Sequence, residues 1–157
     1  MRKRELTVSG ITAAAMLFGA VMGAQGQTTN PRFGVWKMRS DTPPPAINIM
    51  TYEPHGDGGM GITVESTNRQ GRDSKWGYVT MFDGVFRTVT GQQGAETAVE
   101  IVDDRTTRIL NKRNGRVTQV IINTLSEDGN TISNEYVRLD ENGDIVRVTH
   151  AVYERIQ

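Results

Sequence analysis

The chain has 157 residues, of which 36% are hydrophobic, 6% aromatic and 23% charged. That length suits a single domain, and 18 basic residues against 18 acidic ones give no net charge with which to attract nucleic acid. The charged fraction excludes a polytopic membrane protein, the aliphatic content excludes intrinsic disorder, and the lack of cysteine excludes disulfides, Cys-ligated metals and a thiol nucleophile.

Residues 1–26 have the three-part pattern of a secretory signal peptide. A basic start at Arg2–Arg4 precedes an apolar run over 11–24, and Ala24 and Gly26 supply small side chains for a signal peptidase. Because the run is shorter than the roughly 20 residues of a spanning helix, we expect a cleaved signal-peptide helix and not an anchor. The predicted protein is exported, periplasmic or secreted after cleavage near Gly26, and a short linker over 27–32 follows the signal.

From residue 33 onward the sequence alternates polar and apolar residues and is punctuated by turn signals. Asp83-Gly84, Asn114-Gly115 and Asn142-Gly143 favour tight hairpins, since these residues tolerate positive φ. All five prolines lie between positions 31 and 54, so the later hairpins keep every backbone donor. The predicted strands are 33–39, 47–53, 61–68, 75–82, 85–90, 97–103, 107–111, 116–125, 131–139 and 145–156.

This succession predicts an all-β fold over 33–157. We expect a single up-and-down antiparallel β-barrel of about eight to ten strands, because closing the sheet removes its exposed edges. A β-sandwich is the competing architecture, but it needs longer crossing connections than these turns allow. An outer-membrane barrel is not expected, since charges occupy both faces of several strands and stable membrane insertion needs an apolar outer face.

The first and last predicted strands carry a recognisable pair of motifs. Residues 33–37 read Phe-Gly-Val-Trp-Lys, and Gly34-x-Trp36 resembles the signature of lipocalins and of the wider calycin group. Over residues 31–157 the chain resembles small exported, lipocalin-like bacterial proteins whose biochemical role is not established. Further segments that carry the resemblance are Gly56-Asp57-Gly58, Trp76-x-Tyr78, Phe82-Asp83-Gly84, Val89-Thr90-Gly91, Ser126-x-Asp128-Gly129-x-Thr131 and Val152-Tyr153-Glu154.

The resemblance implies a specific closure of the barrel. Trp36 would plug the closed end and Arg155, near the end of the last strand, would pack across it. A guanidinium stacked on an indole is a common structural contact, which favours closure over a ligand-contacting role for Trp36.

A candidate ligand-binding face follows from alternation along the strand predicted over 75–82. Trp76, Tyr78, Thr80 and Phe82 share one face. If that face points inward, it offers a lumen aromatic surface and two hydroxyls, as small-molecule pockets often do. The alternative is a filled barrel, in which the same side chains are ordinary core.

A second candidate is a basic surface patch between residues 105 and 116. It comprises Arg105, Arg108, Lys112, Arg113 and Arg116, with no acidic residue between them. Such a patch suits an anionic partner, but charges at hairpins also prevent edge-to-edge association.

Two functional hypotheses remain open from the sequence. The first is an exported binding protein that holds a small apolar or amphipathic molecule in its lumen. The second is a non-catalytic structural or interaction protein of the cell envelope with a filled barrel, acting through its surface. No catalytic motif and no metal-ligand spacing stands out, so we expect no cofactor and no metal and find no argument for an enzyme. The sequence leaves the oligomeric state open.

Overall fold

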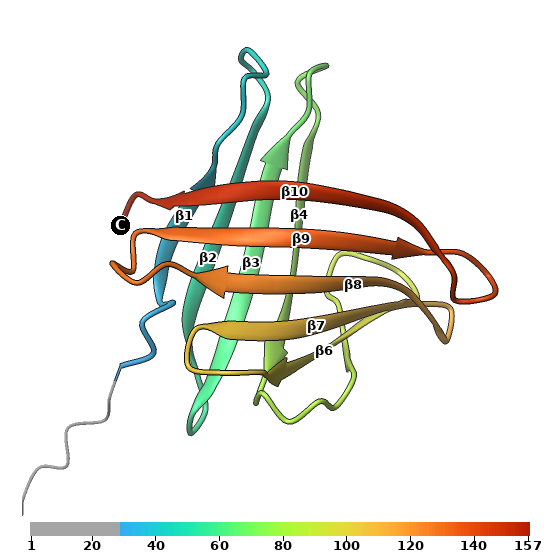
Figure 1. Ribbon diagram of the computed structural model, residues 1–157. Helices are drawn as coiled ribbons and strands as arrows, with labels where there is room; N and C mark the ends of the chain where they lie inside the picture. The colour runs from blue at the N-terminus through green and yellow to red at the C-terminus, as the bar shows by residue number, and fades with distance from the viewer. Residues whose placement is uncertain (1–28) are drawn as a thin grey trace, which may run out of the picture.

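The computed structural model describes residues 29–157, and every helix or strand assigned within them is a β-strand (Figure 1). The expected signal peptide over 1–26 lies outside the described residues. The ten strands are β1 (Gly34–Met38), β2 (Ile47–His55), β3 (Gly59–Thr67), β4 (Asp73–Thr80), β5 (Arg87–Thr88), β6 (Ala95–Ile101), β7 (Thr106–Arg113), β8 (Arg116–Leu125), β9 (Thr131–Leu139) and β10 (Ile145–Arg155).

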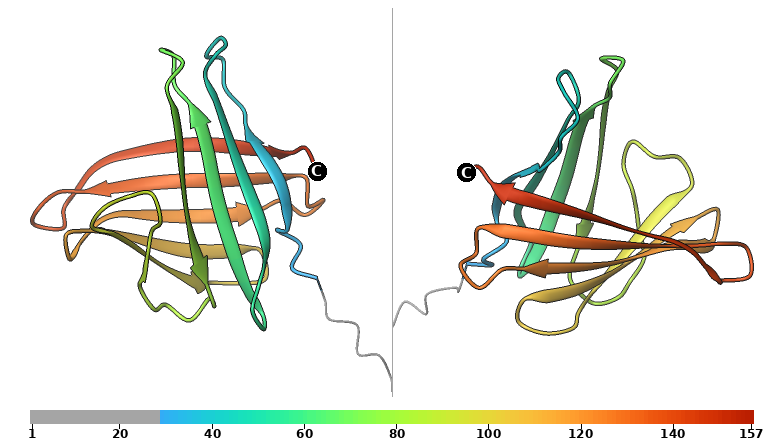
Figure 2. Two further views of the ribbon diagram at one scale, coloured as in Figure 1. Left: turned by 180° about the vertical axis from the view of Figure 1, so that it is seen from behind. Right: turned by 45° about the horizontal axis from the view of Figure 1, so that its top comes forward.

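The strands form one antiparallel sheet in the order β4-β3-β2-β1-β10-β9-β8-β7-β6-β5. Its two ends, β4 and β5, are consecutive in the chain, and they approach each other through a bridge between Gly77 and Thr90. β1–β4 cross β6–β10 at a steep angle (Figures 1 and 2). The result is a nearly closed up-and-down barrel, which confirms the expected fold class.

The hairpins follow the turn chemistry of the sequence. Asn114 and Gly115, between β7 and β8, have φ angles of 51° and 79°. Positive φ at both central residues is the type I′ geometry that matches the twist of the flanking strands. A β-branched or bulky residue in place of Asn114 would be strained there.

The chain between β4 and β5 differs from the sequence prediction. Strands were expected over 75–82 and 85–90, but β4 ends at Thr80 and β5 is two residues long. Phe82 has a φ of 58°, and its N–H donates to the Thr80 hydroxyl at 2.8 Å. The Asp83 carboxylate then accepts from the Val85 N–H at 3.1 Å and from the Arg87 guanidinium at 2.7 Å. These local bonds compete with sheet pairing, so the chain leaves the sheet.

The first and last strands are joined at one end of the barrel by Trp36 and Arg155, which are register partners. The Arg155 guanidinium carbon lies 4.1 Å from the centre of the Trp36 ring, and Trp36 is completely buried. The indole N–H donates to the Arg32 carbonyl at 2.9 Å. Arg155 also donates to three backbone carbonyls, those of Gly129 (2.9 Å), Phe33 (2.6 Å) and Pro31 (2.6 Å).

The core consists of two clusters of buried apolar side chains. The larger one surrounds Trp36, and the smaller one joins β6, β7 and β8. The larger cluster contains Trp36, Met50, Tyr52, Met60, Ile62, Val64, Leu125, Ile132 and Tyr153, and the smaller contains Val99, Ile109 and Ile121. Within residues 29–157 there is no helix of the length and apolar character that crossing a bilayer requires.

Candidate ligand-binding cavity

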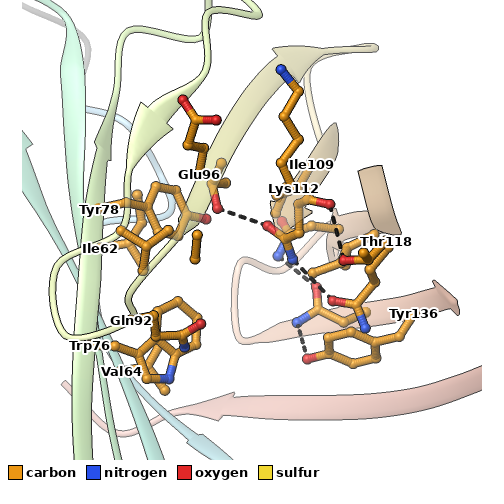
Figure 3. Close-up of a pocket in the computed structure, with 18 of the residues that line it drawn as sticks. Ile62, Val64, Trp76, Tyr78, Gln92, Glu96, Ile109, Lys112, Thr118 and Tyr136 are labelled. Carbon is orange, nitrogen blue, oxygen red and sulfur yellow. Dashed lines mark hydrogen bonds between the residues drawn. The ribbon is translucent and has the colours of Figure 1, made fainter. Parts of the chain in front are cut away.

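The barrel encloses a cavity of about 670 Å³, partly open to solvent (Figure 3). Side chains from β2, β3, β4, β6, β7, β8, β9 and β10 line it, together with residues of the loop after β5. Small-molecule sites in proteins commonly have this size. The interior of this barrel is therefore not filled by its own side chains, and the filled-barrel alternative does not describe it.

One wall of the cavity is apolar and aromatic. β3 supplies Ile62 and Val64, and β4 supplies Trp76 and Tyr78 (Figure 3). The two aromatic rings are nearly parallel, with an interplanar angle of 12° and 6.3 Å between their centroids. Each pair is separated by one residue, so strand alternation directs both members to the same face. This wall offers apolar and aromatic surface to a ligand.

The facing wall carries uncharged polar side chains joined by hydrogen bonds. On β6 and β7 the Thr97 hydroxyl donates to the Asn111 side-chain oxygen at 2.8 Å, and the Asn111 amide donates to the Gln119 side-chain oxygen on β8 at 3.0 Å. The register shifts by one residue beside this point, so Asn111 pairs with Gln119 and Lys112 pairs with Val117. Thr118 is the extra residue of this bulge, and both it and Gln119 line the cavity.

A second chain of hydrogen bonds lies on β8 and β9. The Asn123 amide donates to the Asn134 side-chain oxygen at 2.8 Å, and the Asn134 amide donates to the Tyr136 hydroxyl at 3.1 Å. Asn123 is only 1% exposed, and its own side-chain oxygen accepts from Arg32 Nε at 3.3 Å. The amide of Asn123 also lies 3.5 Å from the Tyr52 hydroxyl. Because buried amides need partners, these bonds fix the wall in one arrangement.

The interior of the cavity disfavours negative charge. Burial raises the pKa of Tyr52, of Tyr78 and of Tyr153 above the ordinary value of a phenol, since a phenolate would lose its hydration there. The charged residues among the lining side chains are Glu96, Lys112, Arg113 and Arg138.

These charged groups belong to the rim of the cavity. The Glu96 carboxylate and the Lys112 ammonium point away from the hydrogen-bonded amides (Figure 3). Lys112 Nζ lies 3.5 Å from the centre of the Phe86 ring, and Arg113 donates to the Gln93 carbonyl at 3.0 Å. The cavity therefore has a charged rim around an uncharged interior.

The structure brings two of the four predicted lumen residues to the cavity. Trp76 and Tyr78 line it. Thr80, on the same face of β4, is 2% exposed and uses its hydroxyl to accept the Phe82 N–H. Phe82 lies beyond the end of β4, with positive φ, and packs against both core clusters. The expectation of one ligand-contacting face thus does not extend to Thr80 and Phe82, because the local bonds after Thr80 end the alternation.

The five basic residues predicted as a surface patch are not brought together. Arg105 precedes β7, whereas Arg113 and Arg116 lie at the opposite end of that strand. Arg105 pairs with Glu127 at 3.3 Å, Arg116 with Glu141 at 3.8 Å, and Arg108 forms an ion pair with Glu100 across the β6–β7 hairpin. Neighbouring carboxylates therefore reduce the positive charge that these side chains present.

Sequence reasoning missed the amides of the polar wall. These amides belong to no motif, yet each lies two positions from an apolar residue of the same strand, as Asn111 lies two positions after Ile109. The amides are those of Asn111, Gln119, Asn123 and Asn134. Alternation alone predicts that they share the inward face. The signal that identifies them is thus their position in the alternation along each strand. It can be used once the buried Trp36 and Leu125 show which face of the sheet points inward.

No family model and no curated protein sequence matches the chain. Its fold is similar to that of the fluorescent protein UnaG. Crystal structures of a substituted form, of the wild type and of a second substituted form of that protein give, in this order, TM-scores of 0.57, 0.55 and 0.54 at 12%, 12% and 11% identity. The matches cover 78% to 81% of this chain and 95% to 97% of the other. The chain therefore has a calycin-type β-barrel fold.

Within that fold the cavity occupies the barrel interior, which is compatible with the binding of a small hydrophobic molecule. Among residues 29–157 no group of three or more His, Asp or Glu side chains is placed to hold a metal ion.

Proposed function

We propose that this protein binds a small apolar or amphipathic molecule inside the barrel. The observation that carries the proposal is the cavity of about 670 Å³ with Trp76 and Tyr78 in its wall. Apolar surface removed from water contributes about 25 cal/mol per Å² to binding, so a ligand that covers this wall gains substantial free energy. The hydrogen bonds of the facing wall hold the cavity in shape before the ligand arrives, which lowers the entropic cost of binding.

The two tryptophans of the chain provide a direct test. Trp76 lines the cavity, whereas Trp36 is buried at the closed end beneath Arg155. N-phenyl-1-naphthylamine, an uncharged dye that emits strongly in apolar surroundings, accepts excitation energy from a nearby indole. We expect saturable dye emission on tryptophan excitation. Trp76→Phe should lose most of that transferred emission and keep the emission that follows direct excitation of the dye.

A matched pair of variants separates the lumen from the outer surface. Thr118 lines the cavity at the bulge of β8, and Thr88 is exposed on β5. Thr118→Phe should weaken dye binding about ten-fold by occupying ligand space, and Thr88→Phe should leave it unchanged. Wild-type affinity in Thr118→Phe, or no saturable binding by the wild-type protein, would contradict a ligand site in the lumen.

We further propose that the protein is exported, on the strength of the signal-peptide pattern over residues 1–26. The mature chain is then periplasmic or secreted and meets its ligand outside the cytoplasm. Mass spectrometry of the protein from fractionated cells that express the full chain should find an N-terminus near Gln27 in the extracytoplasmic fraction. An intact N-terminus in the cytoplasmic fraction would contradict export.

A further inference from the structure

The two opposite walls of the cavity differ in chemistry, and the difference defines a class of ligand. We propose that the lumen selects an uncharged molecule with a flat apolar face and hydrogen-bonding groups along the opposite edge, as in an aromatic carboxamide. This inference rests on the proposed function, because it assumes that the lumen is a binding site. It specifies the chemistry of the part of the ligand that the apolar wall does not contact.

The geometry of the walls places both kinds of contact within one cavity. Ile62, Val64, Trp76 and Tyr78 lie on one side, and the polar side chains that include Thr118 and Tyr136 lie on the other (Figure 3). A ligand whose apolar part covers the side of Trp76 and Tyr78 therefore directs its remaining groups toward the amides. A purely apolar ligand would cover those amides without replacing the water that solvates them, which carries a free-energy cost.

The polar wall retains hydrogen-bonding capacity for a ligand. A primary amide has two N–H donors and a carbonyl with two lone pairs. Asn111 donates one hydrogen bond to Gln119 and accepts one from Thr97. The Gln119 side-chain oxygen accepts that bond from Asn111, and its NH₂ group supplies two further donors at the cavity surface. The wall thus offers both donors and acceptors, as a carboxamide or hydroxyl group requires.

An ionised ligand is disfavoured in the same place. The charged side chains of the lining are those of Glu96, Lys112, Arg113 and Arg138, and all four are at least partly exposed to water. The buried Arg32 does not line the cavity, and its guanidinium is bound by Asn123 and by the Arg105 carbonyl. The raised pKa values of Tyr52, Tyr78 and Tyr153 show the same preference for the uncharged form. The cations nearest the amide wall are Arg138, the register partner of Gln119, which is exposed and hydrated, and Arg32, whose guanidinium is already bound by Asn123 and by the Arg105 carbonyl. Neither fully offsets the hydration that an anion loses on moving from water to this wall.

Three naphthalenes of similar size test the inference. They are 2-naphthamide, which is uncharged and both donates and accepts hydrogen bonds, 2-naphthoate, which is an anion at neutral pH, and 2-methylnaphthalene, which is uncharged and forms no such bonds. Affinities are measured by displacement of N-phenyl-1-naphthylamine from the wild-type protein. We expect 2-naphthamide to bind about ten-fold more tightly than either of the others, which corresponds to one or two well-formed hydrogen bonds.

Gln119→Met keeps the length of the side chain and removes its amide. This variant should reduce the advantage of 2-naphthamide over 2-methylnaphthalene to about three-fold or less while it still binds 2-methylnaphthalene. The control is Gln70→Met, at an exposed glutamine of the β3–β4 turn, which should retain the full advantage. Because Gln119 lies at the cavity surface, dye binding by the variant reports whether the lumen is intact.

The outcomes separate this inference from the function on which it rests. Equal or tighter binding of 2-naphthoate, or equal binding of 2-methylnaphthalene, would overturn the selectivity for uncharged polar ligands and leave the lumen as a binding site. The same holds if none of the three displaces a dye that is bound beside Trp76. An unchanged preference in Gln119→Met would remove the amide wall as its cause. Failure of the dye itself to bind in the lumen would overturn both proposals.

Discussion

Arg155 connects three separate segments of the chain at the closed end of the barrel. It stacks on Trp36 of β1, and it donates to carbonyl groups of the β8–β9 turn and of the segment before β1. A guanidinium suits this position because its planar fork presents several donors while its face covers an aromatic ring.

Replacing Arg155 with lysine should destabilise the fold although the charge is kept. A single ammonium cannot make the three directed bonds and the stacking contact together, so we expect the free energy of unfolding to fall by about 1–3 kcal/mol. Urea denaturation checks this, with Arg147→Lys on the exposed part of β10 as the control. An equal, small effect of both substitutions would show that the closure contributes little to stability.

Gly34 has a conformation and a neighbourhood that exclude a side chain. Its φ is +137°, and a Cβ atom there would lie 2.4 Å from the Gln157 carbonyl oxygen and 2.7 Å from Arg155 Nη1. Gly58, in the β2–β3 turn, also has positive φ, at 83°, but a Cβ there would meet no atom within 4 Å. A side chain at Gly34 therefore meets both a steric clash and a φ that other residues rarely adopt, whereas one at Gly58 meets backbone strain alone.

Alanine at Gly34 should cost more stability than alanine at Gly58. We expect about 1 kcal/mol at Gly58, from backbone strain alone, and about 2–4 kcal/mol at Gly34, where the clash displaces the C-terminal residue or Arg155. The difference in urea midpoint between the two variants measures the clash together with the greater backbone strain at Gly34. A Gly34→Ala protein as stable as Gly58→Ala would mean that the chain end moves aside without cost.

The sequence predicted some residues of the molecule well, and the physical reason lies in their chemistry. Trp36 and Arg155 were identifiable because Gly34-x-Trp36 resembles the lipocalin signature, which implies a basic residue of the last strand packed across the tryptophan. Asn123 was not, because an asparagine in a strand is equally compatible with an exposed face. Its role depends on Asn134, eleven positions later, and the register that brings them together is a tertiary property.

At the scale of the elements, three turns are organised by aspartates whose carboxylates accept hydrogen bonds. Arg87 lowers the pKa of Asp83 by a side-chain hydrogen bond, and the Arg105 backbone N–H lowers that of Asp103. A hydrogen bond from the Ser126 hydroxyl lowers the pKa of Asp128. In each case the folded protein favours the charged form more than the unfolded chain does.

These shifts predict a loss of stability in acid. A carboxyl whose pKa is lower in the folded state contributes stability above its unfolded pKa of about 3.9, and loses it as the pH falls from there through the folded value. We expect the urea midpoint of the wild type to fall below about pH 4, and to fall less in the triple variant Asp83→Asn, Asp103→Asn, Asp128→Asn, which retains acceptor oxygens but does not titrate.

The control for this measurement replaces three other aspartates, Asp41, Asp57 and Asp144, whose carboxylates accept no hydrogen bond from the rest of the described chain. The control should keep the acid sensitivity of the wild type. A triple turn variant that is as acid-sensitive as the control would show that other groups cause the loss.

The elements themselves were largely readable from the sequence. All ten strands occur where alternation and the turn dipeptides predicted them, with shifts of a few residues at their ends. The exception is the segment after Thr80, where side-chain bonds from Thr80 and Asp83 divert the chain. Alternation cannot reveal this, because Phe82 continues the pattern in sequence while its backbone leaves the strand.

At the scale of the whole molecule, the sheet has its fewest pairs between its two ends. β8 and β9 share seven register pairs, β1 and β10 share three and β5 and β6 share two, whereas β4 and the segment around β5 meet at one bridge. That bridge consists of the Gly77 N–H donating to the Thr90 carbonyl at 3.0 Å and the reverse bond at 2.8 Å. Local opening is favoured where few bonds hold two strands together.

Amide hydrogen exchange should locate this opening. We expect the amides of Gly77 and Thr90 to exchange at least about ten-fold faster than those of β8 that bond to β9. N-phenyl-1-naphthylamine bound in the lumen should slow them, since Trp76 adjoins Gly77 in the chain. Equal protection of the bridge and of the β8–β9 ladder would show that the barrel opens only by global unfolding.

The weak bridge between Gly77 and Thr90 also affects how large a ligand the barrel can hold. In a barrel whose strands are hydrogen-bonded around the whole circumference, the number of strands sets the diameter, and widening the barrel breaks a full ladder of hydrogen bonds. Here β4 and the segment around β5 can separate at a cost of about 1–3 kcal/mol, because two backbone hydrogen bonds join them. A bulky ligand can offset this cost through the apolar surface that it covers. The cavity volume of about 670 Å³ is therefore not an upper limit, because separation of β4 from the segment around β5 would widen the barrel.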